Sequence, residues 1–233
     1  MAAKTKLVLV PGLLCTGALW APQIAALSDI ADCTVADHTR HDTMEGIARA
    51  ILAAAPERFA LAGLSMGGYI SYEIVRQAPE RVERLALLDT GSRADTPERT
   101  AARRDLLANA GREGVAHAQK LLMPSLVHKA RLADKVLVDT VLQMAVDTGL
   151  EAFQRQEAAI IGRPDNRPLL PGIGCPTLVL VGEQDALTPP ELAREIAAGI
   201  PGARLEIVSD CGHLSTLERP EAVNSALRAW LTA

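Results

Sequence analysis

Short runs of apolar residues alternate along this chain with longer stretches of helical periodicity, and this alternation restricts the folds that the chain can adopt. The apolar runs predict strands over residues 7–10, 33–36, 59–62, 85–88, 177–181 and 205–208. Such continuous apolar strands are covered on both faces, which is typical of parallel sheets. Helices between them return the chain to the same end of the sheet. The pattern therefore predicts an α/β fold with a doubly wound, mainly parallel, six-stranded sheet.

The strand signal is absent between about residues 93 and 163. This segment has helical periodicity instead, with charged residues on the polar faces of the predicted helices and aliphatic residues on the apolar faces. We therefore predict that residues 1–92 and 164–233 form the core of the fold. Residues 93–163 are predicted to form a helical cap inserted over one end of the sheet.

The composition excludes several classes of partner. The chain has 24 Lys and Arg against 28 Asp and Glu, so it lacks the positive charge that attracts nucleic acid. Its four cysteines are not spaced as metal ligands, and reduced thiols are expected. The chain contains no run of about 18 apolar residues, the length that a membrane-spanning helix needs. The N-terminal segment resembles a secretion signal, but Pro11-Gly12 interrupts its apolar run. We expect a cytoplasmic protein that acts on a small molecule. No feature indicates an oligomeric state.

One motif carries a candidate nucleophile. Gly63-Leu64-Ser65-Met66-Gly67 has the form Gly-x-Ser-x-Gly, and it lies directly between a predicted strand and a predicted helix. Enzymes that hold a nucleophilic serine at a sharp strand-to-helix turn use this arrangement. Flanking glycines lack the Cβ atoms that would clash in such a turn. Ser65 is therefore the predicted nucleophile.

A serine hydroxyl needs a base that takes its proton, and five histidines are available. His213 follows the strand predicted over 205–208, so it is expected at the same sheet edge as Ser65. His38 and His41 follow a weak strand near the margin of the sheet, and His117 and His128 lie in the predicted cap. His213 is therefore the predicted general base.

The base in turn needs an acid that orients its ring. Asp185 follows the strand predicted over 177–181 and is the preferred candidate. Three alternatives stay open, namely Asp89 after the strand that follows Ser65, Glu183, and Asp210 close to His213.

The order Ser65, Asp185, His213, each residue after its own strand, resembles the α/β-hydrolase superfamily over essentially the whole chain. The segment 181–189, Val-Gly-Glu-Gln-Asp-Ala-Leu-Thr-Pro, resembles the acid loop of that family. The segment 211–213, Cys-Gly-His, resembles its histidine loop. This resemblance implies a small serine hydrolase related to carboxylesterases, enol-lactonases and thioester hydrolases, without a metal ion or an organic cofactor.

An oxyanion hole would need two backbone N–H groups. The candidates are Leu13, in the loop after the first strand, and Met66, which follows the nucleophile. The family often has His-Gly-x in that loop, whereas this chain has Pro11-Gly12-Leu13. A backbone amide is sufficient for the chemistry, so Leu13 remains the candidate.

Three large side chains are candidates for the substrate pocket: Trp20, Met123 and Phe153. Each of them is also compatible with packing in the core. Cys15 is expected to pack, and Arg103-Arg104-Asp105 is expected on a solvated helix face. The mainly aliphatic cap predicts an apolar pocket that orients an acyl group by shape and not by charge pairing.

Together these features predict hydrolysis of a small carboxylic ester through an acyl-enzyme intermediate, by a protein of the carboxylesterase type. A thioesterase or a lactonase would use the same residues. A carbon–carbon bond hydrolase and a ligand receptor with little turnover are the remaining alternatives.

Overall fold

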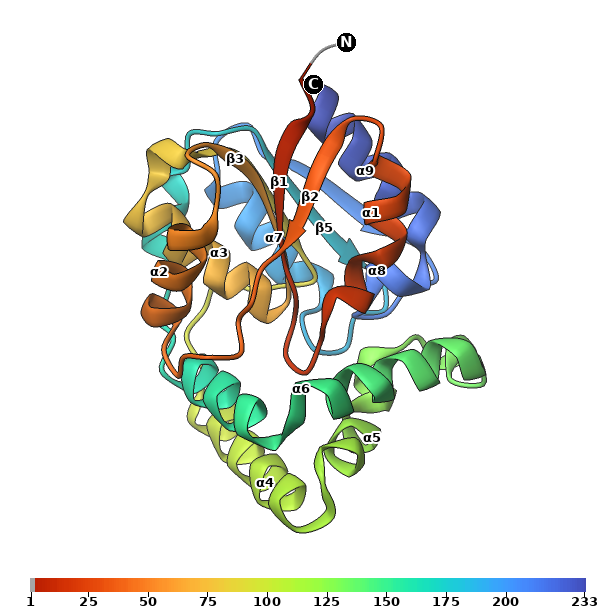
Figure 1. Ribbon diagram of the computed structural model, residues 1–233. Helices are drawn as coiled ribbons and strands as arrows, with labels where there is room; N and C mark the ends of the chain where they lie inside the picture. Colours follow the sequence, from red (N-terminus) through yellow and green to blue (C-terminus); the bar gives the residue numbers. More distant parts are fainter. Residues whose placement is uncertain (1–2) are drawn as a thin grey trace.

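The computed structural model describes residues 3–233. Six strands form one sheet in the order β2-β1-β3-β4-β5-β6, and every neighbouring pair is parallel (Figure 1). The strands are β1 (Thr5–Val10), β2 (Ala31–Val35), β3 (Phe59–Leu64), β4 (Val82–Leu88), β5 (Thr177–Gly182) and β6 (Arg204–Val208). The predicted six-stranded, doubly wound sheet is therefore confirmed.

Helices cover both faces of the sheet. The first face packs against α1 (Ala21–Leu27) and α9 (Pro220–Thr232), and the second against α2 (Met44–Ala54), α3 (Met66–Gln77) and α7 (Pro190–Gly199). Alternate residues of β1 serve the two faces, since Leu7 and Leu9 belong to the first apolar cluster, and Val8 and Val10 to the second. Successive side chains of a strand point to opposite faces, so an apolar run is buried on both.

Several short elements differ from the sequence expectation. The sequence around residues 17–28 is compatible with a single helix. The structure has a 3₁₀ turn, Gly17–Trp20, followed by α1, because the backbone of Trp20 is not helical. A short helix, α8 (Ser215–Glu218), follows the predicted histidine loop and was not predicted. The remaining 3₁₀ turns lie at Pro79–Arg81, Lys129–Arg131 and Arg167–Gly172.

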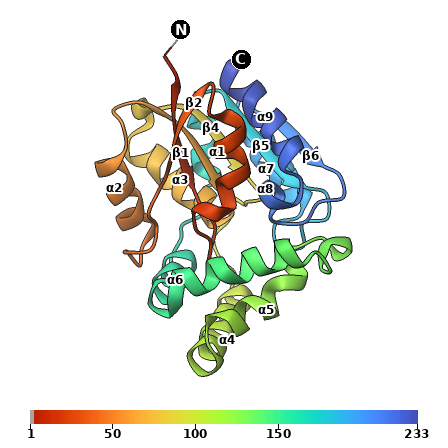
Figure 2. The same cartoon turned by 45° about the vertical axis from the view of Figure 1, so that its right-hand side comes forward.

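Three helices lie between β4 and β5 in the chain: α4 (Pro97–Glu113), α5 (Val115–Leu126) and α6 (Lys135–Ile161). Side-chain caps at Thr96 and Asp134 begin α4 and α6. α6 bends at Gly149, whose φ of 77° is not helical. In both views the three helices lie together below the sheet, away from the two chain termini (Figures 1 and 2).

This helical segment packs on the rest of the protein and is not detached from it. Met123 and Val141 belong to the same apolar cluster as the inner side of α9. The amides of His213 and Leu214 both donate hydrogen bonds to the carbonyl of Leu126, at 3.0 and 3.2 Å. The loop that carries His213 is therefore tied to the end of α5.

In the part of the chain that the structure describes, no helix is both long enough and apolar enough to cross a membrane.

Candidate active site

Ser65 occupies the sharp turn between β3 and α3. Its φ of 55° lies in the left-handed region, which is strained for a residue with a side chain. Two hydrogen bonds hold this conformation. The Ser65 amide donates to the carbonyl of Leu88 (2.9 Å), and the Thr90 hydroxyl donates to the carbonyl of Ser65 (2.8 Å). The strand-to-helix turn expected from the motif is thus present, and the neighbouring strand β4 supports it.

The two glycines of the motif are required by close backbone approaches. A Cβ atom on Gly63 would lie 2.2 Å from the carbonyl oxygen of Gly67. A Cβ atom on Gly67 would lie 2.1 Å from the carbonyl oxygen of Val10. Both distances are far below a normal contact, so no other residue fits without a backbone shift.

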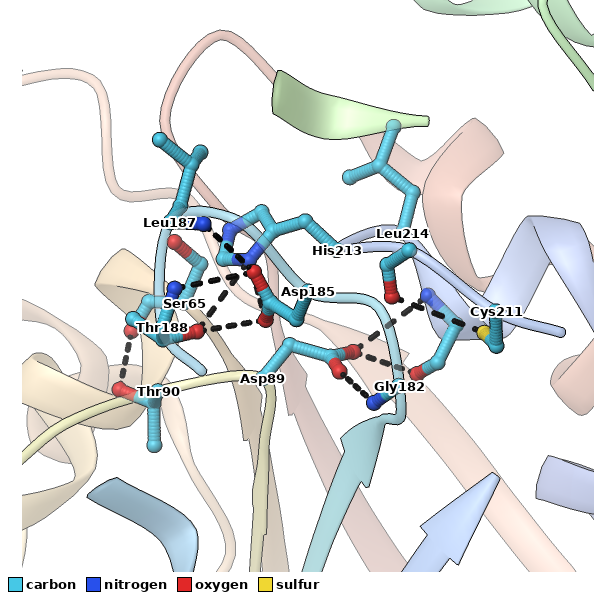
Figure 3. Close-up of polar contacts among 12 residues, drawn as sticks. Ser65, Asp89, Thr90, Gly182, Asp185, Leu187, Thr188, Cys211, His213 and Leu214 are labelled. Atoms are coloured by element: carbon cyan, nitrogen blue, oxygen red, sulfur yellow. Dashed lines mark hydrogen bonds and ion pairs between the residues drawn. The ribbon is translucent and has the colours of Figure 1, made fainter. Parts of the chain in front are cut away.

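His213 and Asp185 form a buried pair. The distance from Nδ1 of His213 to Oδ2 of Asp185 is 2.8 Å, and both side chains are almost completely buried. Because Nδ1 faces the carboxylate, Nε2 is the nitrogen left for a reaction partner. Figure 3 shows the Ser65 side chain beside the imidazole ring of His213, and both residues line the same cavity.

Further donors hold the Asp185 carboxylate in place. The amides of Leu187 and Thr188 each donate to Oδ1 at 2.9 Å, and the Thr188 hydroxyl donates to Oδ2 at 2.6 Å (Figure 3). Burial by itself raises the pKa of Asp185, but His213 and these donors outweigh it and keep that pKa below its ordinary value. Burial lowers the pKa of His213, and the adjacent Asp185 carboxylate raises it above its ordinary value. The pair is thus arranged to stabilise a positive charge on His213.

Asp89, the main alternative acid, has different partners. Its Oδ1 accepts from the amide of Gly182 (2.9 Å), and its Oδ2 accepts from Ser215 (Figure 3). Burial, followed by repulsion from Asp185, raises the pKa of Asp89 to about 8. Asp89 therefore joins the end of β5 to the start of α8 and forms no hydrogen bond with His213.

The other two alternatives lie at the surface. Glu183 and Asp210 are both exposed, and neither side chain contacts His213 through a hydrogen bond within residues 3–233. Of the other histidines, His41 and His117 are exposed and His128 is half-buried.

Glu218, for which the sequence predicted no role, organises the histidine loop. Its carboxylate accepts hydrogen bonds from the amides of Gly212 (3.0 Å), Leu214 (3.3 Å) and His128 (2.8 Å). The first two amides flank His213, and the third comes from the segment that follows α5. One buried side chain therefore connects the histidine loop to the cap.

The loop after β1 is held by Gln156, which the sequence did not single out, and by His38, which was considered only as a base. Gln156 of α6 accepts a hydrogen bond from the amide of Leu14 through Oε1 (3.1 Å). Nε2 of His38 lies 3.0 Å from both the carbonyl oxygen of Gly12 and Nε2 of Gln156. The Gly12 carbonyl also accepts from the amide of Cys15 (3.1 Å). The polar groups on both sides of Leu13 are thus used.

The backbone N–H groups of the two oxyanion-hole candidates have no acceptor in the described part of the chain. Over residues 3–233, neither the Leu13 N–H nor the Met66 N–H donates to a protein acceptor. Gly12, Leu13 and Ser65 line the cavity, whereas the Met66 side chain is buried in the core. No sequence signal marks Gln156, because its partner Leu14 is 142 positions away in the chain.

A cavity of about 250 Å³ lies between the ends of the strands and the cap. Much of its lining is aliphatic, as expected for an apolar pocket. The leucine and isoleucine residues of the lining are Leu13, Leu64, Leu106, Leu122, Leu126, Ile160, Leu187 and Leu214. Cys15 also lines the cavity, and burial raises the pKa of its thiol to about 12, so it is not an activated nucleophile.

Two expectations about the cavity need correction. The three candidate pocket residues, Trp20, Met123 and Phe153, are not part of its lining, because their side chains are buried in apolar clusters. Arg103 is not on a solvated face. It lines the cavity and pairs with Asp95 and Glu157, with 20% of its side chain exposed. Packing of the cap turns this side of α4 inward.

Comparisons with known proteins identify the family of the chain. A family model described as the alpha/beta hydrolase family matches residues 7–226. The chain is 30% identical over 244 residues to "Putative carbamate hydrolase RutD" of Serratia proteamaculans, an alignment that covers 97% of this chain and 90% of that protein.

Two solved structures are similar over the whole chain. An esterase from Thermogutta terrifontis, solved with malate bound, has a TM-score of 0.90 and 30% identity, and 91% of its chain is covered. The enol-lactonase of Burkholderia xenovorans LB400 has a TM-score of 0.89 and 28% identity, and 93% of its chain is covered.

Proposed function

Because the chain belongs to the α/β hydrolase family, we propose that it is a serine hydrolase that cleaves a small carboxylic ester through an acyl-enzyme intermediate. In this proposal Ser65 is the nucleophile, His213 the general base and Asp185 the acid that orients His213. The observation that carries the proposal is the buried contact between His213 Nδ1 and Asp185, with Ser65 on the other side of the ring.

The reaction takes place in two steps. His213 Nε2 accepts the Ser65 proton while Oγ bonds to the ester carbonyl carbon, and the electron pair of the C=O bond moves to its oxygen. When the tetrahedral intermediate collapses, the alcohol leaves with the proton from His213. A water molecule then attacks the acyl-enzyme, gives one proton to His213, and releases the carboxylic acid. The proton finally returns to Ser65.

In both steps negative charge develops on the carbonyl oxygen. The unused amides of Leu13 and Met66 are the proposed donors to it. Leu13, in the loop after β1, lines the cavity, and Met66, at the start of α3, follows the lining residue Ser65. The positive end of the α3 dipole adds to the stabilisation at Met66.

A direct test combines active-site labelling with turnover. The protein should react with a fluorophosphonate probe at Ser65, located by mass spectrometry of the labelled peptide, and should hydrolyse p-nitrophenyl butyrate. A cavity of this size favours such short acyl groups over long ones. Labelling without turnover would support a ligand receptor, and the absence of both would contradict the proposal.

Lactonase activity is a second candidate, because a lactone is a cyclic ester and is opened by the same steps. The similarity to the enol-lactonase of Burkholderia xenovorans supports this candidate. Thioesters are cleaved by the same residues as well. Assays with p-nitrophenyl butyrate, a δ-lactone and an acyl thioester at equal concentrations would rank the three by kcat/KM.

Replacing Gln156 with Leu should lower kcat by about 10- to 100-fold with a smaller effect on KM. Loss of the hydrogen bond to the Leu14 amide would free the loop that presents Leu13, and small displacements of a transition-state donor are costly. Gln143→Leu is the matched control, since Gln143 lies on the exposed side of α6. An unchanged kcat in a folded Gln156→Leu protein would exclude this positioning role.

A further inference from the structure

Arg99 places a positive charge without a carboxylate partner on the wall of the cavity that contains Ser65 and His213. Its guanidinium donates one hydrogen bond, to the carbonyl of Leu187 at 2.6 Å. Within residues 3–233 no Asp or Glu oxygen lies within the 4.0 Å of an ion pair. Four of the five guanidinium N–H groups therefore have no acceptor within residues 3–233.

The other charges around the cavity balance one another. Arg103 pairs with Glu157 (2.9 Å) and with Asp95 (3.3 Å), and Arg163 pairs with Asp95 (2.8 Å). This network contains two cations and two carboxylates. Asp185 is not part of the cavity lining, since His213 and Thr188 cover it. The charge of Arg99 is consequently the uncompensated one on the cavity wall.

Gln119 provides an independent sign of a polar ligand. This residue of α5 lines the cavity and is 1% exposed, and in the part of the chain that the structure describes neither its buried Oε1 nor its Nε2 forms a hydrogen bond. A buried amide without a partner destabilises the folded protein. A ligand acceptor in the cavity can accept a hydrogen bond from the Nε2 amide of Gln119, whereas Oε1 would need a donor.

The residues of α4 that line the cavity also indicate a polar ligand. Four residues of α4 line the cavity at helical spacing: Arg99, Ala102, Arg103 and Leu106. A helix that covers a purely apolar site has apolar residues on such a stripe. Two arginines on the inner face of the cap are therefore unexpected for a pocket that selects by shape alone.

From these observations, and on the basis of the proposed ester hydrolysis, we infer that the substrate carries a carboxylate. Arg99 binds this carboxylate in the cavity, and the side-chain amide of Gln119 donates a further hydrogen bond. A planar guanidinium binds a carboxylate through two parallel, charge-assisted hydrogen bonds. A neutral ester cannot form this pair. The substrate class is thus a short ester with a free acid group, such as a half-ester of a dicarboxylic acid.

Binding without turnover tests this inference. In the Ser65→Ala background, isothermal titration calorimetry would compare methyl hydrogen glutarate with the neutral dimethyl glutarate. We expect the half-ester to bind at least about 10-fold more tightly, as for a charge-assisted contact. Arg99→Gln should reduce this preference to about 2-fold or less, and Arg99→Lys should retain an intermediate preference because it keeps the charge.

Two more variants separate recognition from folding. Arg104→Gln removes a neighbouring arginine that is exposed and lies outside the cavity lining, so it should leave the preference unchanged. Gln119→Leu should weaken binding of methyl hydrogen glutarate several-fold while raising Tm, since it removes an unsatisfied buried amide. Gln119→Leu leaves the hydrogen bond from Arg99 to Leu187 in place, so its effect on binding is independent of that contact.

Equal binding of the two esters, or a preference that survives Arg99→Gln in a folded protein, would overturn the inference. Hydrolysis of methyl hydrogen glutarate and of p-nitrophenyl butyrate by the wild-type protein is measured in parallel. Turnover without a preference for the half-ester would refute the inference and leave the proposed function standing. A preference without turnover would support carboxylate binding and refute the proposed function.

Discussion

Replacing Ser65 with Ala should abolish hydrolysis of short p-nitrophenyl esters while leaving the fold intact. Loss of the nucleophile removes the covalent step, and such deletions in a serine protease lower kcat by roughly 10⁶-fold. The fold should persist because the backbone of this turn is held by Leu88 and Thr90 and not by the serine hydroxyl. The measurement is kcat for p-nitrophenyl butyrate, with circular dichroism as the check on folding.

Ser71→Ala is the matched control for this variant. Ser71 lies on the same helix, and its buried hydroxyl donates to the carbonyl of Gly67 at 2.7 Å. Its removal should cost about 1 kcal/mol of stability and little kcat. A Ser65→Ala protein that retains more than about a hundredth of the wild-type kcat would disprove the assignment of the nucleophile.

Asp185→Asn should lower kcat far more than Asp89→Asn or Asp210→Asn. Of these three aspartates, Asp185 alone accepts a hydrogen bond from His213, and an amide at that position would favour the wrong tautomer of the ring. The corresponding change in a serine protease lowers kcat by about 10⁴-fold. Asp89→Asn and Asp210→Asn should stay within about 10-fold of the wild-type protein. A severe loss in Asp89→Asn alone would assign the acid to the strand after Ser65.

The pH dependence of the same variants gives a second measurement. His213 must be neutral to accept a proton, and Asp185 raises its pKa above the ordinary value of 6.5. In the wild-type protein, kcat/KM should therefore fall as the pH drops through a value above 6.5. Asp185→Asn removes the charge that raises this pKa, so its remaining activity should persist to lower pH. If the acidic limb of the kcat/KM profile lies at the same pH in Asp185→Asn as in the wild-type protein, Asp185 does not raise the pKa of His213.

Asp89→Asn should instead alter the stability profile. The pKa of Asp89 is about 8 in the folded protein against 3.8 when the group is free. The folded state thus favours the protonated form, and the wild-type protein should lose stability as the pH rises from about 4 to about 8. An asparagine does not titrate, so urea denaturation of Asp89→Asn should show a smaller loss over this range.

The sequence was sufficient for the parts of the fold that depend on local patterns. An apolar run such as Leu7–Val10 is buried on both faces in the structure. The helix that the sequence predicts from Met66 to about Gln77 is present as α3. The glycines around Ser65 also predicted a sharp turn. Period and turn chemistry are properties of a few neighbouring residues, so they can be predicted without knowing the rest of the chain.

The sequence could also place Ser65, Asp185 and His213 near one another, because parallel strands end at the same edge of a sheet. It could not decide between Asp185 and Asp89 by the same argument, since each follows a strand. In the structure Asp185 hydrogen-bonds to His213, whereas Asp89 binds Gly182 and Ser215. The choice depends on the rotation of each loop and on the direction of each side chain.

The lining of the cavity was decided by tertiary structure alone. Arg99 and Arg103 belong to a helix whose polar pattern indicates a solvated surface, yet the packing of α4 against α5 and α6 turns them toward Ser65. Phe153 was a candidate for the pocket because it is large and apolar, but its side chain is buried inside the cap. A periodic pattern shows which residues share a face of a helix. The partner that covers this face is determined by contacts between segments far apart in the chain, and these contacts exist only in the folded protein.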